Sequence, residues 1–164
     1  MKKQLWLMLL VVSASGSSMF AVHMNMSAQY KKVDMYEDAI KKHADNIEDA
    51  IESFVSQNNL DKTQYRLVSK WEKAVIRHAD NIEDMIEKCC KQQLCLPVHN
   101  KINKELQLLD RTSGYLISNA NKFLEMYPDA QALHNKINDE IEQLNKAISN
   151  FEKEVNAFIQ QHNQ

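Results

Sequence analysis

Two histidines are the side chains whose type and placement best suit chemistry. His43 and His78 each begin the same string, His-Ala-Asp-Asn-Ile-Glu-Asp, at 43–49 and 78–84. Both stand in an apolar pattern whose other positions hold Ile, Ala and Met. If two antiparallel helices join near Asn59, the rings lie at nearly equal height, because each helical residue rises about 1.5 Å. Two facing imidazoles could ligate a transition metal or a haem iron. The alternative is a pair of hydrogen-bonded histidines at the core edge, inherited together by duplication.

Three cysteines and a third histidine gather at one predicted connection. Cys89 and Cys90 precede it, Cys95 lies within it, and His99 follows one helical turn later. Thiolates with an imidazole suit zinc or copper(I). An oxidising compartment favours a disulfide instead, for which Cys90 and Cys95 are the candidates. The odd number of cysteines also leaves room for a free or intermolecular thiol, so three alternatives stay open.

Two acidic stripes repeat together with the histidine motif. Their carboxylates follow the spacing i, i+3, i+4, i+7, so we expect each stripe on the outward face of a helix. Such a face could dock a basic protein partner, or it could simply be solvated. Specific calcium binding is not expected, because a helix cannot wrap a cation as an EF-hand loop does. The residues are Asp45, Glu48, Asp49, Glu52, Asp80, Glu83, Asp84 and Glu87.

Signatures of catalysis and of nucleic-acid binding are missing from the sequence. There is no Gly-x-Ser-x-Gly turn, no phosphate-binding loop, no Glu-x-x-His pair and no Cys-x-x-Cys-His motif. The 20 basic and 22 acidic side chains give a slightly acidic balance, without the basic surplus of a nucleic-acid binder. We therefore expect no enzyme, no nucleic-acid partner, and no cofactor beyond the metal or haem that His43 and His78 could hold.

Residues 1–21 have the three parts of a secretory signal peptide. Lys2 and Lys3 are followed by an apolar run at 5–12 and by small residues at 13–18. An apolar run of this length is too short to span a bilayer, which takes about 20 residues. The prediction is a periplasmic or secreted mature protein with no transmembrane segment. Residues 22–28, which contain His and Met, are expected to form a flexible tail.

Internal duplication with a period of 35 residues organises the rest of the chain. Besides the histidine motif, His-Asn-Lys-Ile-Asn occurs at 99–103 and again at 134–138. This period equals five heptads, so the apolar 4-3 pattern keeps its phase through each duplication. A 4-3 pattern draws a narrow apolar stripe along an α-helix. The 2 glycines and 2 prolines are too few for the turns of a sheet protein.

Breaks in the apolar pattern divide the chain into long helices. Short connections make neighbouring helices antiparallel. We therefore predict an all-α fold, an up-down-up-down four-helix bundle of two hairpins within 29–164. An extended tandem of two hairpins that pairs with another molecule is the alternative. The helices are expected at 29–57, 61–91, 97–126 and 129–162.

The functional expectation follows from this architecture. We expect an exported, non-enzymatic bundle that binds another protein or a second copy of itself through its helix faces. The alternative is a small periplasmic metal or haem carrier that uses His43 and His78.

Overall fold

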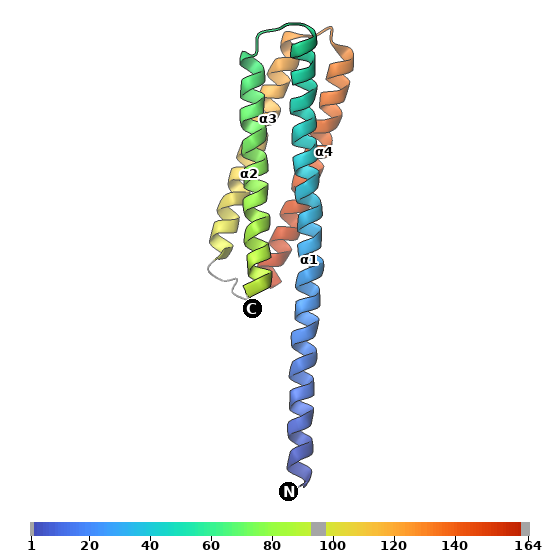
Figure 1. The fold of residues 1–164 in the computed structure, drawn as a ribbon, viewed down its shortest axis with the longest axis vertical. Helices are drawn as coiled ribbons and strands as arrows, with labels where there is room; N and C mark the ends of the chain where they lie inside the picture. Colours follow the sequence, from blue (N-terminus) through green and yellow to red (C-terminus); the bar gives the residue numbers. More distant parts are fainter. Residues whose placement is uncertain (1, 93–97, 162–164) are drawn as a thin grey trace.

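Four helices make up the computed structural model, which describes residues 2–92 and 98–161. They are α1 (Lys2–Gln57), α2 (Thr63–Gln92), α3 (His99–Met126) and α4 (Gln131–Gln161) (Figure 1). The described residues contain no strand. The predicted all-α class and the four predicted helices are therefore confirmed.

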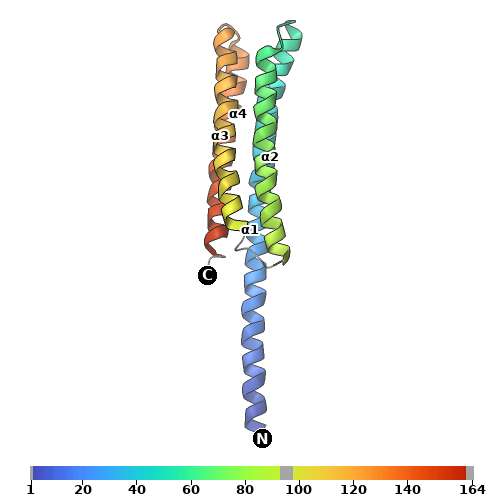
Figure 2. The same cartoon turned by 90° about the vertical axis from the view of Figure 1, so that its left-hand side faces the viewer.

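The helices form an up-down-up-down bundle. The α1–α2 and α3–α4 connections lie at the same end, and α1 runs antiparallel to α2 (Figures 1 and 2). The closest packing is between α1 and α4 and between α2 and α3, followed by α1 against α2, whereas α3 and α4 touch least. The two hairpins thus pack on each other within one chain, so the bundle is confirmed over the extended tandem.

The apolar 4-3 pattern supplies the core of this bundle. Val33, Ile40 and Ile47 on α1 are fully buried, and so are their counterparts 35 residues later, Val68, Val75 and Ile82 on α2. The second duplication behaves in the same way, since Leu109 and Leu144 are both fully buried on α3 and α4. Each duplicated helix therefore carries the same buried stripe.

Helix α1 ends in a C-terminal capping motif that the asparagines of the α1–α2 turn favour. Asn59 adopts a positive φ of 50°, and the N–H of Leu60 donates to the carbonyl of Val55 at 3.0 Å. This is a Schellman arrangement, in which asparagine tolerates the left-handed conformation better than most residues. The Asp61 carboxylate then accepts from the N–H of Thr63 at 3.2 Å and stabilises the start of α2.

Helix α1 extends far beyond the bundle at its N-terminal end (Figure 2). It runs from Lys2 without interruption, so residues 22–28, predicted as a flexible tail, are helical in the full chain. No proline and only one glycine, Gly16, stand in this stretch, so nothing in the sequence forces a break. The signal peptide stays a prediction. Among the described residues, no helix is long and apolar enough to cross a membrane.

Candidate functional site

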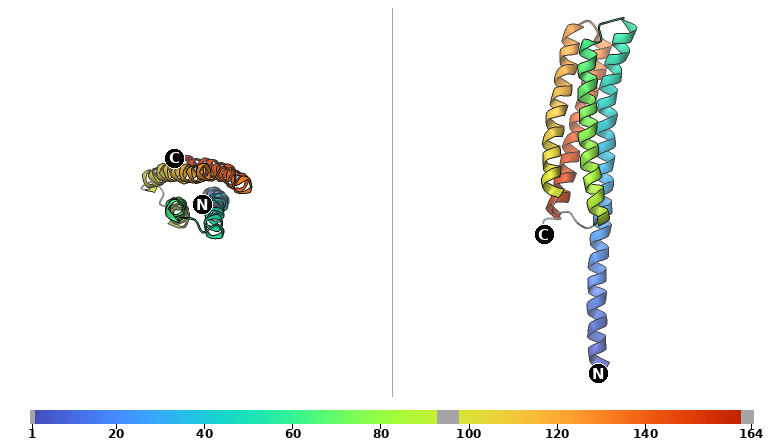
Figure 3. Two further views of the ribbon diagram at one scale, coloured as in Figure 1. Left: turned by 90° about the horizontal axis from the view of Figure 1, so that it is seen from above. Right: turned by 60° about the vertical axis from the view of Figure 1, so that its left-hand side comes forward.

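Two polar contacts between helices form a duplicate pair. His43 on α1 contacts Glu140 on α4, and His78 on α2 contacts Glu105 on α3. His78 follows His43 by 35 residues, and Glu140 follows Glu105 by the same number. The two duplications therefore create an approximate two-fold relation that exchanges α1 with α2 and α4 with α3. Figure 3 shows the four helices end-on, with α1 and α2 on one side and α3 and α4 on the other.

Each histidine is fixed by a carboxylate on another helix. The Nδ1 atoms of His43 and His78 lie 2.6 Å from an oxygen of Glu140 and Glu105, respectively. A carboxylate only accepts, so Nδ1 carries the proton and donates it. His78 is 7% exposed. Burial alone raises the pKa of the Glu105 carboxyl, but hydrogen bonds from His78 and Asn81 outweigh it and hold the pKa below its usual range.

An asparagine from the same motif completes each contact. Asn46 donates to the second oxygen of Glu140 at 3.1 Å, and Asn81 donates to Glu105 at 3.3 Å. Sequence reasoning missed both glutamates, although Glu105 and Glu140 also repeat at the 35-residue spacing. Two His–Asn–Glu clamps of the same composition thus join α1 to α4 and α2 to α3.

These contacts turn the two histidines toward different helices. His43 faces α4 and His78 faces α3, and each ring has its own carboxylate. The hydrogen bonds agree with the alternative of core-edge histidines inherited by duplication. Neither ring belongs to a group of three ligand-type side chains within the described part of the chain, where the one such group is Glu48, Asp49 and Glu52. A metal or haem held by both histidines stays a prediction.

A row of polar contacts joins α1 to α2, and we call it the polar seam. Its outer members are a tyrosine–glutamate pair at each end. The Tyr65 hydroxyl donates to Glu48 at 2.7 Å, and the Tyr30 hydroxyl donates to Glu83. Burial and the Glu48 hydrogen bond raise the pKa of Tyr65 above its usual range, and the Glu83 hydrogen bond does the same for Tyr30. The full set is Tyr30, Glu37, Lys41, Asp45, Glu48, Tyr65, Glu72, Asp80 and Glu83.

The centre of the polar seam holds two buried glutamates. Glu37 is 3% exposed and Glu72 is 7% exposed, and they are 35 residues apart. Each contacts an aspartate of the facing helix, Asp80 and Asp45, respectively. Burial, reinforced by the neighbouring aspartate, raises the pKa of both glutamates from 4.5 to about 7.

None of the residues of the acidic stripes is buried, but half of them also contact the neighbouring helix. Asp45, Glu48, Asp80 and Glu83 belong to the polar seam and are used between α1 and α2. A helix exposes several faces, and the spacing alone cannot tell which of them a neighbouring helix covers. The remaining four are Asp49, Glu52, Asp84 and Glu87, of which the last two pair with Lys88 and Lys91. Partner binding by the whole stripe stays a prediction.

Two cysteines, Cys89 and Cys90, lie at the C-terminal end of α2. Cys89 is buried, as its position in the apolar pattern suggests, and Cys90 is half-buried. Cys95 lies outside the described residues, so the predicted disulfide between Cys90 and Cys95 stays a prediction. His99 is buried at the first position of α3.

A shallow pocket of about 310 Å³ lies between α2 and α3, beside the His78–Glu105 clamp. Its lining combines lysines with acidic and amide groups and has one large apolar side chain. Ligand sites for small molecules are usually lined mainly by apolar side chains, so this pocket is a weak candidate. The lining residues are Asn81, Asp84, Met85, Lys88, Lys101, Lys104 and Glu105.

An aromatic patch lies at the surface where α2 meets α3, with Trp71 half-buried against the core. The rings of Trp71 and Tyr115 lie 4.5 Å apart. Lys70 lies over the Trp71 ring at 4.8 Å, and Arg111 lies over the Tyr115 ring at 5.6 Å. Tyr115 is 37% exposed, and Leu67, one helical turn before Trp71, is 39% exposed. The sequence alone does not reveal this group, because α2 and α3 are brought together only by the fold.

Comparison with known proteins gives no match: no family model, no curated protein and no solved structure is similar to this chain.

Proposed function

We propose that the protein is an exported, non-enzymatic helical-bundle module that acts by binding another protein or a second copy of itself. The aromatic patch of Leu67, Lys70, Trp71, Arg111 and Tyr115 is the surface on which this proposal rests. Tryptophan, tyrosine and arginine are the residues most enriched where protein interfaces gain their binding energy. Export rests on the predicted signal peptide.

The duplication allows the aromatic patch on α2 and α3 to be compared with the equivalent positions on α1 and α4. Stepping by 35 residues replaces Trp71 with Tyr36 and Tyr115 with Asn150, and it replaces Leu67 with Lys32. Lys32 pairs with Glu154 on α4 at 3.5 Å. The α1–α4 face thus keeps one aromatic ring, Tyr36, but lacks the second ring that pairs with Trp71 on the α2–α3 face, although both faces carry the same kind of core and clamp. A pair of aromatic rings in one copy alone supports a role outside the shared architecture.

The use of the polar side chains supports a non-enzymatic role. His43, His78, Glu37 and Glu72 all contact polar groups on other helices. A general acid or base must instead reach a substrate from a pocket. Each of these contacts also occurs twice, which is expected if a structural contact was copied when its helix was duplicated.

Site-specific crosslinking tests the proposed surface. A photoreactive phenylalanine analogue at position 115 of the full chain, expressed in a bacterial host, is expected to give a discrete adduct in the cell envelope. The same analogue at Asn150, the counterpart of Tyr115, is the matched control and is expected to give little adduct. Mass spectrometry of the adduct distinguishes a second copy from another protein. Equal labelling at both positions, or none at either, would contradict the proposal.

Elemental analysis tests the carrier alternative on the same purified protein. We expect less than about 0.1 equivalent of transition metal and no haem absorption, because the two rings contact different helices and neither belongs to a group of three ligand-type side chains among the described residues. The comparison is His43→Gln/His78→Gln, in which the amide can still donate to the glutamate but is a poor metal ligand. Stoichiometric metal or a Soret band in the wild type, lost in this variant, would favour the carrier.

A further inference from the structure

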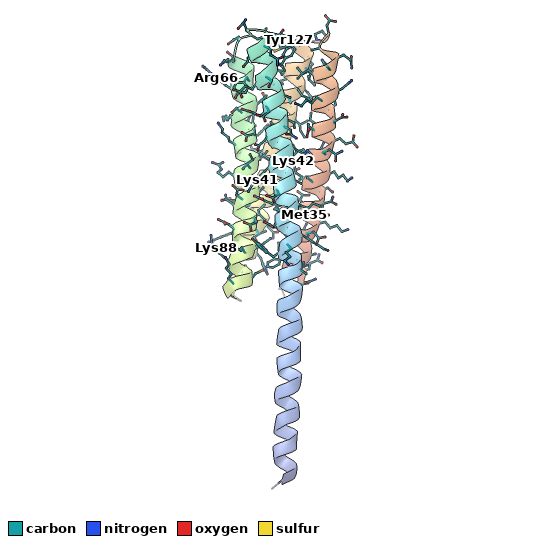
Figure 4. The ribbon with its side chains drawn as sticks, turned by 45° about the vertical axis from the view of Figure 1, so that its right-hand side comes forward. Met35, Lys41, Lys42, Arg66, Lys88 and Tyr127 are labelled. Atoms are coloured by element: carbon teal, nitrogen blue, oxygen red, sulfur yellow. The ribbon has the colours of Figure 1, made fainter. Side chains whose placement is uncertain are left out.

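The pocket between α2 and α3 is lined by more positive than negative side chains. Three of its seven lining residues are lysines, Lys88 from α2 and Lys101 and Lys104 from α3. Two are carboxylates, Asp84 and Glu105. Lys88 lies near the C-terminal end of α2 (Figure 4), and α2 and α3 lie side by side along this face (Figure 2). The pocket therefore concentrates positive charge on a protein that is slightly acidic as a whole.

The two carboxylates of the pocket are already engaged. Glu105 accepts both hydrogen bonds of its clamp, and Asp84 lies 3.6 Å from the amino group of Lys88. Lys101 and Lys104 are exposed, and neither forms an ion pair with a carboxylate in the part of the chain that the structure describes. These two lysines are three residues apart on α3, so they are neighbours on the helix surface, where like charges repel each other. A bound anion would relieve this repulsion.

The duplication shows that this positive charge is not required by the shared fold. A step of 35 residues keeps the type of four lining residues and changes the other three. The changed pairs are Met85 and Ala50, Lys88 and Ser53, and Lys104 and Asp139. The equivalent positions on α1 and α4 therefore hold one lysine and three carboxylates, the reverse of the balance in the pocket.

We propose that this pocket binds a small multivalent oxyanion, a molecule with two or more carboxylate or phosphate groups. An ammonium group is a compact point charge without the planar fork of a guanidinium, so lysines respond to the total charge of a ligand more than to the shape of one anionic group. Met85 is half-buried at the pocket and offers an apolar contact to any carbon atoms of the ligand. A volume of about 310 Å³ is at the lower end of the range for ligand sites, which suits a small molecule. The charged lining that disfavours an apolar ligand is what an oxyanion requires.

The pocket is separate from the aromatic patch on the same two helices. Asn81 follows Trp71 by ten residues, which is about 15 Å along α2. Oxyanion binding therefore goes beyond the proposed protein interface and does not depend on it. Loss of ligand binding in a pocket variant and loss of the crosslinked adduct at Tyr115 are separate results.

NMR titration of the nitrogen-15-labelled full chain at pH 7 tests the pocket, in about 20 mM salt so that the charges are little screened. Pyrophosphate and citrate are the probes, because both are multivalent and they differ in the anionic group. We expect saturable shifts of the backbone amide signals of Met85, Lys101 and Lys104, with a dissociation constant below about 1 mM for at least one probe. Acetate, with a single charge, is expected to bind at least about tenfold more weakly. A tenfold preference between the two multivalent probes identifies the ligand as a phosphate or a carboxylate compound.

A pair of matched variants separates the pocket from a general charge effect. Lys88→Ser/Lys104→Asp gives the pocket the charged residues of its counterpart and is expected to weaken binding of the tighter probe at least about tenfold. The control, Lys122→Asp/Lys146→Ser, makes the same change of charge at exposed positions outside the pocket and is expected to weaken binding less than about twofold. Circular dichroism checks that both variants are folded. Lys104→Gln alone, expected to weaken binding about threefold, replaces the pocket variant if that variant unfolds.

Three results would overturn the oxyanion site. One is the absence of saturable shifts with both multivalent probes up to about 10 mM. Another is equal weakening in the pocket variant and in its control, which would mean that the probes respond to the overall charge of the chain. The last is shifts of similar size at Asp49 and Asp139, because the counterpart of the pocket lacks the surplus of lysines.

Discussion

Replacing Phe123 with alanine is expected to lower the free energy of unfolding by about 3–5 kcal/mol, through lost burial and the cavity left behind. Phe123 is 1% exposed. Its ring lies 6.0 Å from that of Phe54 on α1 and 5.0 Å from that of Tyr127, which in turn lies 5.2 Å from Phe54. Tyr127 stands in the α3–α4 turn at the end of the bundle (Figure 4). The three rings therefore link the α1–α2 end of the bundle to the α3–α4 turn. Elsewhere along their length, α3 and α4 have little contact with each other.

Urea unfolding at pH 7 measures this loss, with Met126→Ala as the matched control. Met126 lies in the same last turn of α3 but is 54% exposed. Its removal is expected to change stability by less than about 0.5 kcal/mol, as at most exposed positions. If Phe123→Ala lost under 1 kcal/mol, the ring cluster would not be holding this end of the bundle.

The fold was predictable because its information is local and repeated. The 4-3 pattern predicts which side of each helix is buried. Because the duplication spans five heptads, the same prediction applies to α2 and to α4. The break at Asn58 and Asn59 also has a local cause, since Asn59 takes the left-handed conformation. The predicted start of the first helix at residue 29 differs from the structure, in which α1 begins at Lys2. That prediction came from the signal-peptide pattern and not from any helix-breaking residue.

The partners of the functional side chains were not predictable in the same way. His43 and His78 repeat at helical spacing, but only the rotation of each helix about its axis decides whether a ring points across the hairpin or toward another helix. It points toward α4 and α3, where it contacts Glu140 and Glu105. These glutamates lie two residues after the repeated His-Asn-Lys-Ile-Asn motif, but nothing in the sequence identifies them as the partners of the histidines. The spacing of the acidic stripes likewise did not reveal which of their residues contact a neighbouring helix. Asp45 and Glu48 follow an outward spacing and are not buried, yet both contact side chains of α2.

Loss of both His–Asn–Glu clamps is expected to cost about 3–5 kcal/mol of stability in His43→Ala/His78→Ala. A hydrogen bond to a charged group contributes about 1.5–3 kcal/mol, and each substitution removes one and leaves a half-buried glutamate with only its asparagine. A double-mutant cycle of His78→Ala with Glu105→Ala isolates the interaction from the cavity. We expect a coupling energy of about 1–2 kcal/mol by urea unfolding at pH 7.

Acid provides a second measurement of the same clamp. Because the folded pKa of Glu105 lies below its ordinary 4.5, its contribution is present above that value and is lost as pH falls through the folded pKa. Wild type and His78→Ala are therefore expected to converge in stability as pH falls toward 3. A difference that stays constant with pH would mean that His78 contributes packing and not an interaction with the carboxylate.

The cycle of His43→Ala with Glu140→Ala completes the test, because it applies the same measurement to the other copy. The two clamps share residue types, the 2.6 Å histidine contact and an asparagine donor. If duplication copied a structural clamp, the two coupling energies should agree within about 0.5 kcal/mol. A zero coupling in one copy alone would mean that its histidine has been released from the structural role. That ring would then be the better place to look for a ligand.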